Sequence, residues 1–335
     1  MSTWFNTRGP HPDTVLASFV RLARNIEGVP YPVRLNVRQK EALNERVCAA
    51  LTAAKISCSV IRPDTLYPYE AVSLAEQCVI TPEFAAAADG ALLLRLEDEP
   101  LSLMLCDEDH VRILSSAAGL APETAYEAAS RCDDLLDAQL HFAFDARLGF
   151  LNQDPSNIGT GMKASVLMHL PALSRNGSVA YLASTAARLG LTVKGAFGDG
   201  ITVKGDMYRI SNTLTLGLSE EDALGNLKAL CLQLATRERA AAEEQIGELA
   251  VQDKIRRAWA VLSGAALLSA DEMTEMLSAV RMGAVYGLIK ADTAVINELF
   301  VTMQPASINC IAGQKLPRAE RDALRAKLVR EKLLN

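Results

Sequence analysis

The stretch "FLNQDPSNIGTGMKASV", residues 150–166, holds the glycine loop that decides the fold. Gly159 and Gly161 stand two positions apart and are followed by Lys163 and Ser165, a composition typical of loops that bind phosphate. The spacing does not match a P-loop, which needs G-x-x-x-x-G-K-S/T, or a dinucleotide loop, which needs G-x-G-x-x-G. Taken alone, the stretch therefore predicts only a glycine turn beside a solvated lysine, and the rest of the chain must decide its role.

The composition indicates a chain with two domains and no membrane span. The 335 residues are 50% hydrophobic, which is enough to bury a large core. The net charge of −6 argues against nonspecific nucleic-acid binding, and no run approaches the ~20 apolar residues of a membrane helix. The N-terminus lacks the apolar core of a signal peptide, so we expect a cytoplasmic protein. Seven scattered cysteines without C-x-x-C and four scattered histidines predict reduced thiols and no protein metal site.

Hydrophobic periodicity divides the chain into a mixed α/β part and a helical part. Residues 90–114 form two apolar runs joined by the acidic turn "EDEP", which predicts an antiparallel pair of strands. The other expected elements are strands at 191–195 and 207–217 and helices at 37–55, 121–140 and 179–189. Ser219 is a natural N-cap for one long amphipathic helix, after which the pattern is nearly all helical. We place a domain boundary near residue 240, between residues 1–240 and a helical domain of residues 241–335.

Four segments, in register, resemble the ATP:guanidino phosphotransferases, and most of all their bacterial branch, the protein arginine kinases. "VLASFVRLARN" (15–25) is similar to the family's V-L-S-S-R-I-R-L-A-R-N, and "CDEDHVRI" (106–113) to N-E-E-D-H-L-R-I. "LGFLNQDPSNIGTGMKASVLMHLPAL" (148–173) resembles F-G-Y-L-T-S-C-P-T-N-L-G-T-G-L-R-A-S-V-M-L-H-L-P-A-L. "VKGAFGDG" and "GDMYRISNTLTLG", within 193–217, resemble V-R-G-L-Y-G-E-G and G-N-I-F-Q-I-S-N-Q-I-T-L-G. The order and spacing agree over about 200 residues, so the four segments support one another.

The resemblance implies an α+β, phosphagen-kinase-like (glutamine-synthetase-like) fold. In that fold an antiparallel sheet flanked by helices is followed by an all-helical C-terminal domain. The resemblance also implies phosphoryl transfer from ATP, with Mg²⁺ held by the nucleotide phosphates. Cations stabilise the charge on the transferred group, and arginines suit this task because their forked donors match phosphate oxygens. The acceptor is a guanidinium, which carboxylates hold, orient and can deprotonate.

The matching positions give a set of candidate site residues. The resemblance implies that the catalytic residues are Glu108, Asp199 and Asp154, the last in place of the family's substrate cysteine. It implies that the nucleotide is bound by Arg21, Arg24, Arg112, Lys163, Ser165, Lys194, Gly195 and Gly198. His110 lies in the acidic motif but is expected to be structural.

Six positions depart from the family pattern. They are Phe19 and Lys163 and Lys194 for arginines, Cys78 for a histidine at the nucleotide, Asp154 for the cysteine, and Asp199 for glutamate. Lysine keeps the charge of arginine but loses its bidentate fork. A carboxylate displaced by ~1 Å can cost on the order of 100-fold in rate. Phe19 removes a cation outright, and no neighbour in the sequence restores it, so we expect a weakened nucleotide site.

The tail contains a second motif, R-D-x-x-R-A, formed by Arg321, Asp322, Arg325 and Ala326. In protein arginine kinases this motif forms an allosteric pocket for phosphoarginine, and the resemblance implies the same here. Arg321 and Arg325 lie four apart on one helix face and can bind a phosphate, while Asp322 can pair with the ligand's guanidinium. The alternative is an ordinary charged helix face, which is the usual meaning of such a run.

Two functions of different classes stay open from the sequence. The first is a kinase that uses ATP to phosphorylate arginine side chains of protein substrates. The second is an inactive pseudokinase that binds phosphoarginine proteins through its tail, or regulates an active arginine kinase or the Clp protease machinery. A kinase for a small guanidino compound is a weaker third, because the chain lacks the separate N-terminal helical domain that encloses such substrates. We expect a homodimer, and neither nucleic acid nor a membrane as a partner.

The missing cation at position 19 leads to a first test. If this loss weakens the site, Phe19→Arg restores a phosphate contact and raises ATP affinity and kinase activity together. Nucleotide titration and label transfer from ATP measure the two quantities. No gain in either would contradict the idea that Phe19 limits the site.

Overall fold

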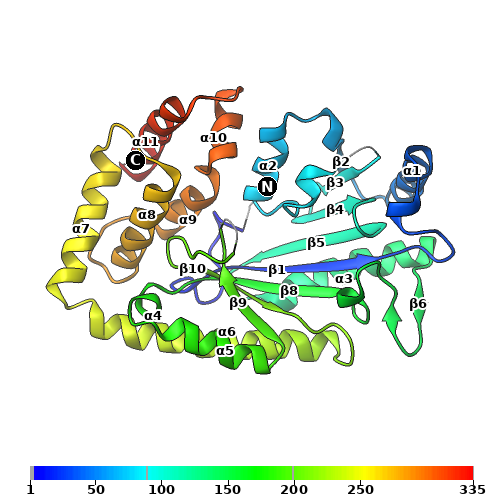
Figure 1. Cartoon of the computed structure of the whole chain (residues 1–335), viewed down its shortest axis with the longest axis horizontal. Coiled ribbons are helices and arrows are strands. Elements are labelled where there is room, and N and C mark those ends of the chain that lie inside the picture. The colour runs from blue at the N-terminus through cyan, green and yellow to red at the C-terminus, as the bar shows by residue number, and fades with distance from the viewer. Residues whose placement is uncertain (1–3, 88–89, 198–199, 335) are drawn as a thin grey trace.

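A single antiparallel sheet forms the centre of the computed structural model, which describes residues 4–87, 90–197 and 200–334. Within this part of the chain the sheet has eight strands in the order β2-β3-β4-β5-β1-β8-β10-β9 (Figure 1). The strands are β1 Val15–Arg24, β2 Cys58–Ile61, β3 Leu92–Leu96, β4 Leu101–Leu105, β5 Val111–Ala118, β8 Met162–His169, β9 Leu191–Gly195 and β10 Met207–Asn212. A separate small hairpin pairs β6 (Phe144–Asp145) with β7 (Gly149–Phe150).

Helices flank this sheet and then form the whole tail of the chain, from α7 onward (Figure 1). They are α1 Val37–Ala53, α2 Pro68–Glu76, α3 Pro122–Leu140, α4 Pro171–Arg175, α5 Ser178–Arg188, α6 Glu220–Gln245, α7 Leu249–Gly264, α8 Ala270–Val285, α9 Thr293–Thr302, α10 Pro305–Ala312 and α11 Arg318–Leu334. Short 3-10 turns lie at Pro32–Arg34, Pro63–Thr65, Phe84–Ala86 and Pro155–Asn157. This confirms the expected fold class, an α+β sheet protein with a helical C-terminal region. In this part of the chain, no helix is long and apolar enough to cross a membrane.

Local signals in the sequence predicted several elements well. The expected pair of strands in 90–114 is the β3–β4 hairpin, and β9 has the predicted bounds. The hydroxyl of Ser219 accepts a hydrogen bond from the Asp222 N–H at 3.1 Å, so it is the N-cap of α6 as expected. The last sheet strand is shorter than predicted, because β10 ends at Asn212 rather than at residue 217. The Asn212 side chain donates to the Leu214 carbonyl, which turns the chain out of the sheet.

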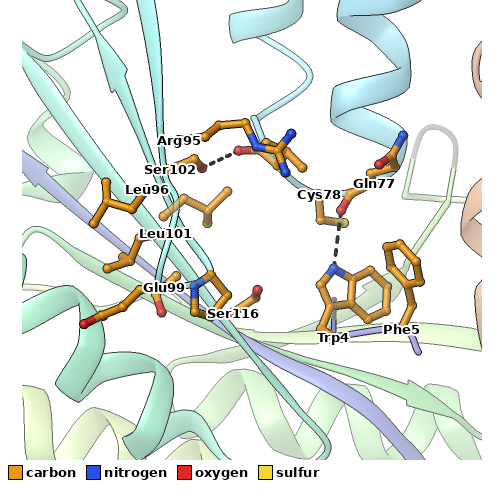
Figure 2. Close-up of a pocket in the computed structure, with 14 residues that line it drawn as sticks. Trp4, Phe5, Gln77, Cys78, Arg95, Leu96, Glu99, Leu101, Ser102 and Ser116 are labelled. Atoms are coloured by element: carbon orange, nitrogen blue, oxygen red, sulfur yellow. Dashed lines mark hydrogen bonds between the residues drawn. The ribbon is translucent and has the colours of Figure 1, made fainter. Parts of the chain in front are cut away.

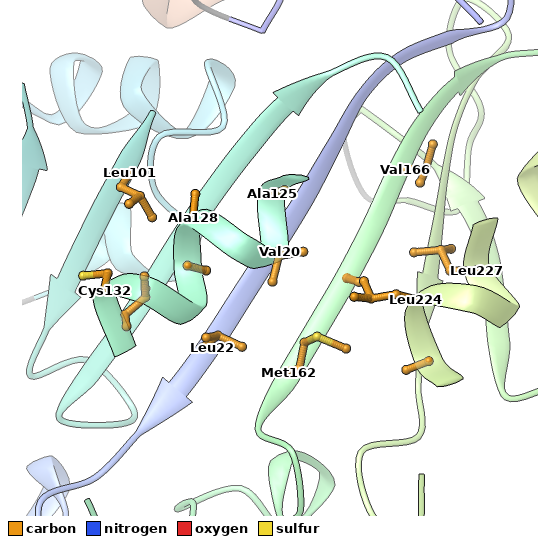
Figure 3. Packing of buried hydrophobic residues seen from close by; sticks show 14 of the residues in the cluster. Val20, Leu22, Leu101, Ala125, Ala128, Cys132, Met162, Val166, Leu224 and Leu227 are labelled. Carbon is orange, nitrogen blue, oxygen red and sulfur yellow. The ribbon is translucent and has the colours of Figure 1, made fainter. Parts of the chain in front are cut away.

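The two faces of the sheet have different chemistry because side chains alternate along each strand. On one face, Val20 and Leu22 of β1 and Met162 and Val166 of β8 are buried. Figure 3 shows these side chains directed toward α3 and α6, with Ala125 and Leu224 among the helix residues that cover them. The opposite face of the same strands carries the charged residues Arg21 and Lys163 beside apolar ones such as Phe19, and a cleft lies there.

Glu238 joins α6 to α4 beneath the sheet. It is 3% exposed, and its carboxylate accepts the N–H groups of Ala172 and Leu173 at 2.8 and 2.9 Å. These are backbone donors at the start of α4 that have no partner inside the helix. Burial raises the pKa of Glu238 to about 7, against the hydrogen bonds, which lower it. The carboxylate therefore titrates near neutral pH.

Arg281 of α8 links the helical tail to the N-terminal segment of the chain. It is fully buried, and its two Nη atoms donate to the carbonyls of Pro12 and Asp13 at 2.8 and 2.7 Å. Nη1 also lies 3.0 Å from His169 Nδ1, at the end of β8, while Nε donates to Asn297 in α9. Burial lowers the pKa of Arg281 to about 10, which leaves it charged at neutral pH. A buried guanidinium that uses acceptors from both halves of the chain fixes the tail on the sheet domain.

We expect the stability of the protein to fall as pH rises from 5 to 8, in part because of Glu238. The folded state keeps the Glu238 proton up to about pH 7, whereas the unfolded chain loses it near the ordinary value of 4.5. Stability from this group is therefore present at low pH and lost as pH rises, by about 3 kcal/mol at most. Glu238→Gln is uncharged and should remove this part of the slope. Urea unfolding at pH 5 and 8 measures it, with exposed Glu244→Gln as the matched control; equal slopes in all three proteins would contradict the assignment.

Candidate active site

A cleft of about 710 Å³ lies on the polar face of the sheet. Its floor is formed by β1, β8 and β10, and its walls by α2, the loop after β9 and the start of α8 and α10. The tail therefore contributes to the same cavity as the sheet, through residues such as Thr274 and Pro305. The glycine loop of residues 150–166 enters β8 directly below the cleft.

Cationic side chains converge on this floor because their strands are neighbours. Arg21 of β1 is paired with Lys163 of β8 in the strand register, so both project from the same face. Arg112 of β5 lies on one side of this pair and Lys194 of β9 on the other. Each of these two positive charges disfavours the charged form of Lys163, and the charge of Arg21 disfavours the charged form of Arg112. Burial lowers the pKa of Lys163, and the neighbouring positive charge of Arg21 lowers it further. Four residues predicted from separate motifs are thus brought together by the sheet.

Arg21 is left without a full set of partners. Its Nε is buried and has no hydrogen-bond acceptor within the described residues. Burial lowers the pKa of Arg21, while the charges of Asp109 and Glu83 act in the opposite direction. A buried donor without an acceptor costs free energy, and an anionic oxygen in the cleft would remove that cost. Arg21 therefore has a buried donor that an anionic oxygen in the cleft could satisfy.

Arg112 and Glu108 are paired with each other. The guanidinium of Arg112 contacts Asp107 at 2.6 Å, Asp109 at 3.4 Å and the carboxylate of Glu108. Asp109 is fully buried and also accepts from the Asn25 side chain, which makes it part of the scaffold. Glu108 is half-exposed, so its carboxylate can exchange one guanidinium for another. The structure places both predicted residues at the site, joined in an ion pair.

The structure does not support the predicted role of Arg24 at the nucleotide. Arg24 lies on the opposite face of β1 from Arg21 and is 2% exposed. Its guanidinium forms a bidentate ion pair with Asp133 of α3, and Nη1 donates to the Thr160 carbonyl. Its charged carbon lies 3.5 Å from the centre of the Phe150 ring. Arg24 therefore holds the glycine loop from the face of the sheet that the helices cover. Side chains alternate along β1, so Arg24 points away from the cleft that Arg21 lines.

The glycines of the loop are needed for close backbone contacts. Gly159 has φ +110°, and a Cβ atom there would lie 2.1 Å from the Thr215 carbonyl oxygen. The neighbouring Thr160 N–H donates to that same carbonyl at 2.8 Å. The loop is thus held by the segment after β10 as well as by Arg24. This supports a rigid loop rather than a solvated turn.

Asp154 stands beside the cationic floor. Its carboxylate accepts from the N–H and the hydroxyl of Ser156 at 2.9 and 2.7 Å. These hydrogen bonds lower the pKa of Asp154, and the positive charge of Lys163 lowers it further. Asp154 is therefore ionised at neutral pH and opposes part of the positive charge of Lys163.

The loop after β9 is described only in part. Gly195 lines the cleft, and its N–H donates to the Gly200 carbonyl at 3.0 Å. The predicted residues Gly198 and Asp199 lie outside the described residues. Ser165 also lines the cleft, on β8. His110 is fully buried and accepts the Ile26 N–H through Nδ1, which agrees with the structural role expected of it.

Five charged residues of the cleft lining were missed by the sequence analysis, and Arg209 and Glu83 are two of them. Arg209 of β10 donates to Ser165 Oγ at 3.1 Å and lies over the ring of Phe19. Glu83 lines the cleft, and its negative charge partly opposes the burial that lowers the pKa of both Arg21 and Arg112. For Arg209 a signal existed, because an arginine stands where the family segment has glutamine. For Glu83 no motif in the sequence pointed to it.

A smaller pocket of about 70 Å³ adjoins the cleft. Figure 2 shows Trp4 and Phe5 of the N-terminal segment on one side of it, next to Cys78 and Gln77. Trp4 Nε1 donates to the Gln77 carbonyl at 3.3 Å. Cys78 borders both cavities, and its backbone has φ +56°. The N-terminal segment therefore packs directly against the position where the family has a histidine.

The tail motif has a mixed geometry. Arg325 is fully buried, with Nε donating to the Met303 carbonyl and Nη1 to the Leu268 carbonyl, both at 2.8 Å. Nη1 also pairs with Asp322 at 2.5 Å. Arg325 Nη2 and Arg321 Nε are buried and have no acceptor in the described part of the chain. Most of Arg325 is thus used to hold α11, while two donors of the motif are free for an anion.

The structural comparisons agree on the fold. A crystal structure of lombricine kinase matches 70% of this chain and 68% of its own, with a TM-score of 0.60 and 22% identity. A taurocyamine kinase from Schistosoma mansoni matches 77% of this chain and 38% of its own, with a TM-score of 0.62 and 21% identity. At this level of identity the likeness concerns the fold, which is that of the phosphagen kinases.

Comparisons of sequence are more specific. Residues 40–241 match the family ATP:guanido phosphotransferase, C-terminal catalytic domain, and residues 248–335 match the Protein-arginine kinase McsB C-terminal domain. The chain belongs to the ATP:guanido phosphotransferase family. The protein-arginine kinase of Halothermothrix orenii is 38% identical over 337 residues, 99% of this chain and 97% of the relative. That of Clostridium tetani is 36% identical over 338 residues, 100% of this chain and 99% of the relative.

The free donors of the tail motif lead to a ligand test. Phosphoarginine should raise the midpoint of thermal unfolding by a few degrees, because a ligand that binds only the folded state stabilises it. Arg321→Ala should abolish this rise with little effect on the unliganded protein. Arg325→Ala is unsuitable, because it also removes the contacts to Met303 and Leu268. Free arginine is the control ligand, and a rise that survives Arg321→Ala would rule out this site.

Proposed function

We propose that the protein transfers the γ-phosphoryl group of ATP to arginine side chains of proteins. The observation that carries the proposal is the half-buried Arg21, whose Nε has no acceptor in the described part of the chain, beside Lys163 and the Arg112–Glu108 pair. Relatives named protein-arginine kinase that match the whole chain support the choice of acceptor. The matched tail family supports it independently of the sheet domain.

The cations of the cleft floor would bind the phosphates of ATP. Arg21 offers a desolvated guanidinium, and Lys163 and Lys194 add charge without a fork. Mg²⁺ held by the nucleotide would neutralise part of the charge of the phosphate oxygens. Because the cations are fixed by strands, they need little rearrangement when charge moves in the transition state.

Glu108 would hold the arginine that receives the phosphoryl group. A guanidinium is protonated at neutral pH and is a poor nucleophile, so a carboxylate must orient it and accept a proton. In the reaction a nitrogen of the acceptor forms a bond to the γ-phosphorus while the bond between that phosphorus and the oxygen of ADP breaks. The proton leaves the guanidinium for the carboxylate and then for solvent. Substrate would displace Arg112 from Glu108, which frees Arg112 for the phosphate.

Other expectations stay part of the proposal. We divide the chain into a catalytic domain of residues 1–240 and a helical domain of residues 241–335 that senses phosphoarginine and forms a homodimer. Asp154, ionised beside Lys163, and Asp199 would add negative charge for the acceptor guanidinium. A cytoplasmic location and a link to the Clp machinery also stay predictions.

Label transfer tests the proposal. The protein, γ-labelled ATP and Mg²⁺ are incubated with an unfolded model protein, and acid-labile label on arginine is measured. Glu108→Gln keeps the size of the side chain and should lower the rate by about 100-fold or more. Glu97→Gln, an exposed acid of the β3–β4 turn, is the matched control and should leave the rate unchanged.

The outcome separates the two functions left open by the sequence. Label on arginine that depends on Glu108 supports the kinase. No label, from folded protein and with an active arginine kinase working alongside, overturns the proposal and leaves the phosphoarginine-binding protein. Label that is equally strong in Glu108→Gln would overturn the role of Glu108 rather than the activity.

A further inference from the structure

Arg209 and Phe19 form an unusual pair on the cleft floor. The guanidinium carbon of Arg209 lies 4.8 Å from the centre of the Phe19 ring, within the range of a cation–π contact. Arg209 belongs to β10 and Phe19 to β1, with β8 between them. Ser165 of β8 is paired with Phe19 in the register, and its hydroxyl accepts from Arg209 Nη1 at 3.1 Å. The arginine therefore reaches across β8 to the position of Phe19.

The ring of Phe19 is also packed against Trp4 of the N-terminal segment. Phe19 is 3% exposed, and Trp4 packs against it edge to face with ring centres 5.3 Å apart. Trp4 is itself fixed by its hydrogen bond to the Gln77 carbonyl, as Figure 2 shows. A fixed ring gives a fixed surface for the guanidinium above it. Phe19 is thus a support for Arg209 and has no exposed face of its own for a ligand.

The guanidinium of Arg209 is not neutralised. Its partners are the Ser165 hydroxyl and the Cys78 sulfur, which lies 3.4 Å from Nη2. The hydroxyl is an uncharged acceptor and the sulfur is a weak one. Among the described residues, Arg209 forms no ion pair with an acid. Arg112, by contrast, contacts three carboxylates. Arg209 lines the cleft together with Arg21 and Lys163, so its charge faces the same space as theirs.

We propose that Arg209 binds a phosphate group of the nucleotide and supplies the cation that position 19 lacks, with Phe19 as its positioning residue. The inference rests on the proposed function, because it assumes that the cleft takes a nucleotide polyphosphate. The family segment has its arginine at position 19 of β1, whereas this chain has Arg209 on β10. The guanidinium of Arg209 enters the same cavity from the other side of β8. The nucleotide site is therefore rearranged rather than short of one cation.

This arrangement reverses the expectation for Phe19→Arg. An arginine at position 19 would enter a buried site beside Trp4 and directly beneath the charge of Arg209. Two guanidinium groups this close together repel each other. The substitution also removes the Phe19 ring that Arg209 contacts. The single substitution is now expected to weaken nucleotide binding. It should help only when Arg209 is neutralised at the same time.

The test is a double-mutant cycle read by ADP binding and by label transfer. Arg209→Gln should weaken ADP binding by about 10- to 100-fold, as expected for loss of a charged hydrogen bond. Adenosine, which has no phosphate, should bind equally to wild type and Arg209→Gln. Arg209→Lys keeps the charge and should lose less than Arg209→Gln. The double variant Phe19→Arg/Arg209→Gln should bind ADP better than either single variant, because the effects of contacting residues are not additive.

Controls separate this inference from the proposed function. Exposed Arg188→Gln on α5 removes one cation elsewhere and should leave ADP binding unchanged. If wild type binds ADP and labels arginine while Arg209→Gln matches it in both, the inference about Arg209 fails alone. If wild type neither binds ADP nor transfers label, the proposed function fails. Equal losses of ADP and adenosine in folded Arg209→Gln would mean a structural role for Arg209 and would overturn the inference.

Discussion

The register between β1 and β8 is the constraint on which the site depends. Side chains alternate along a strand, so the burial of Val20 and Leu22 against α3 and α6 forces Phe19 and Arg21 to the other face. Antiparallel pairing then sets Lys163 beside Arg21, and the next strand adds Arg209. A slip of one residue would bury the cations under the helices and expose the apolar side chains. The apolar core thus determines where the charged groups stand.

Burial of a cation has a free-energy cost, which the protein offsets differently at each buried arginine. Arg112 is surrounded by carboxylates, Arg24 is paired with Asp133, and Arg281 uses backbone carbonyls. These three are stable without any ligand. Arg21 and Arg209 differ from these three. Within the described residues, Arg21 Nε has no acceptor, and Arg209 contacts the Phe19 ring and the Ser165 hydroxyl. The residues that are least compensated by the protein are those that gain most from an anion.

Sequence patterns predicted the parts of this structure that depend on neighbours along the chain. The N-cap of α6, the β3–β4 hairpin and the bounds of β9 follow from turn residues and periodicity. Arg24 was misassigned, because a motif does not reveal which strand face a residue occupies. The contact between Arg209 and Phe19 was missed, because it depends on β1 and β10 flanking the same strand, 190 positions apart in the chain. Arg325 was predicted to bind phosphoarginine, and only the packing of α11 shows that most of its donors are used inside the protein.

The contacts of Arg281 also bear on which fragments of the chain can be stable on their own. Its acceptors belong to the N-terminal segment and to His169, at the end of the strand that carries the glycine loop. A fragment cut after α6 would keep these acceptors but lose their donor, and would uncover the apolar side chains on which the tail rests. Residues 40–241, which match the catalytic family, also omit β1, the strand between β5 and β8, so we do not expect this segment to fold on its own. Because the sheet and the helical tail share these buried contacts, we expect them to unfold together.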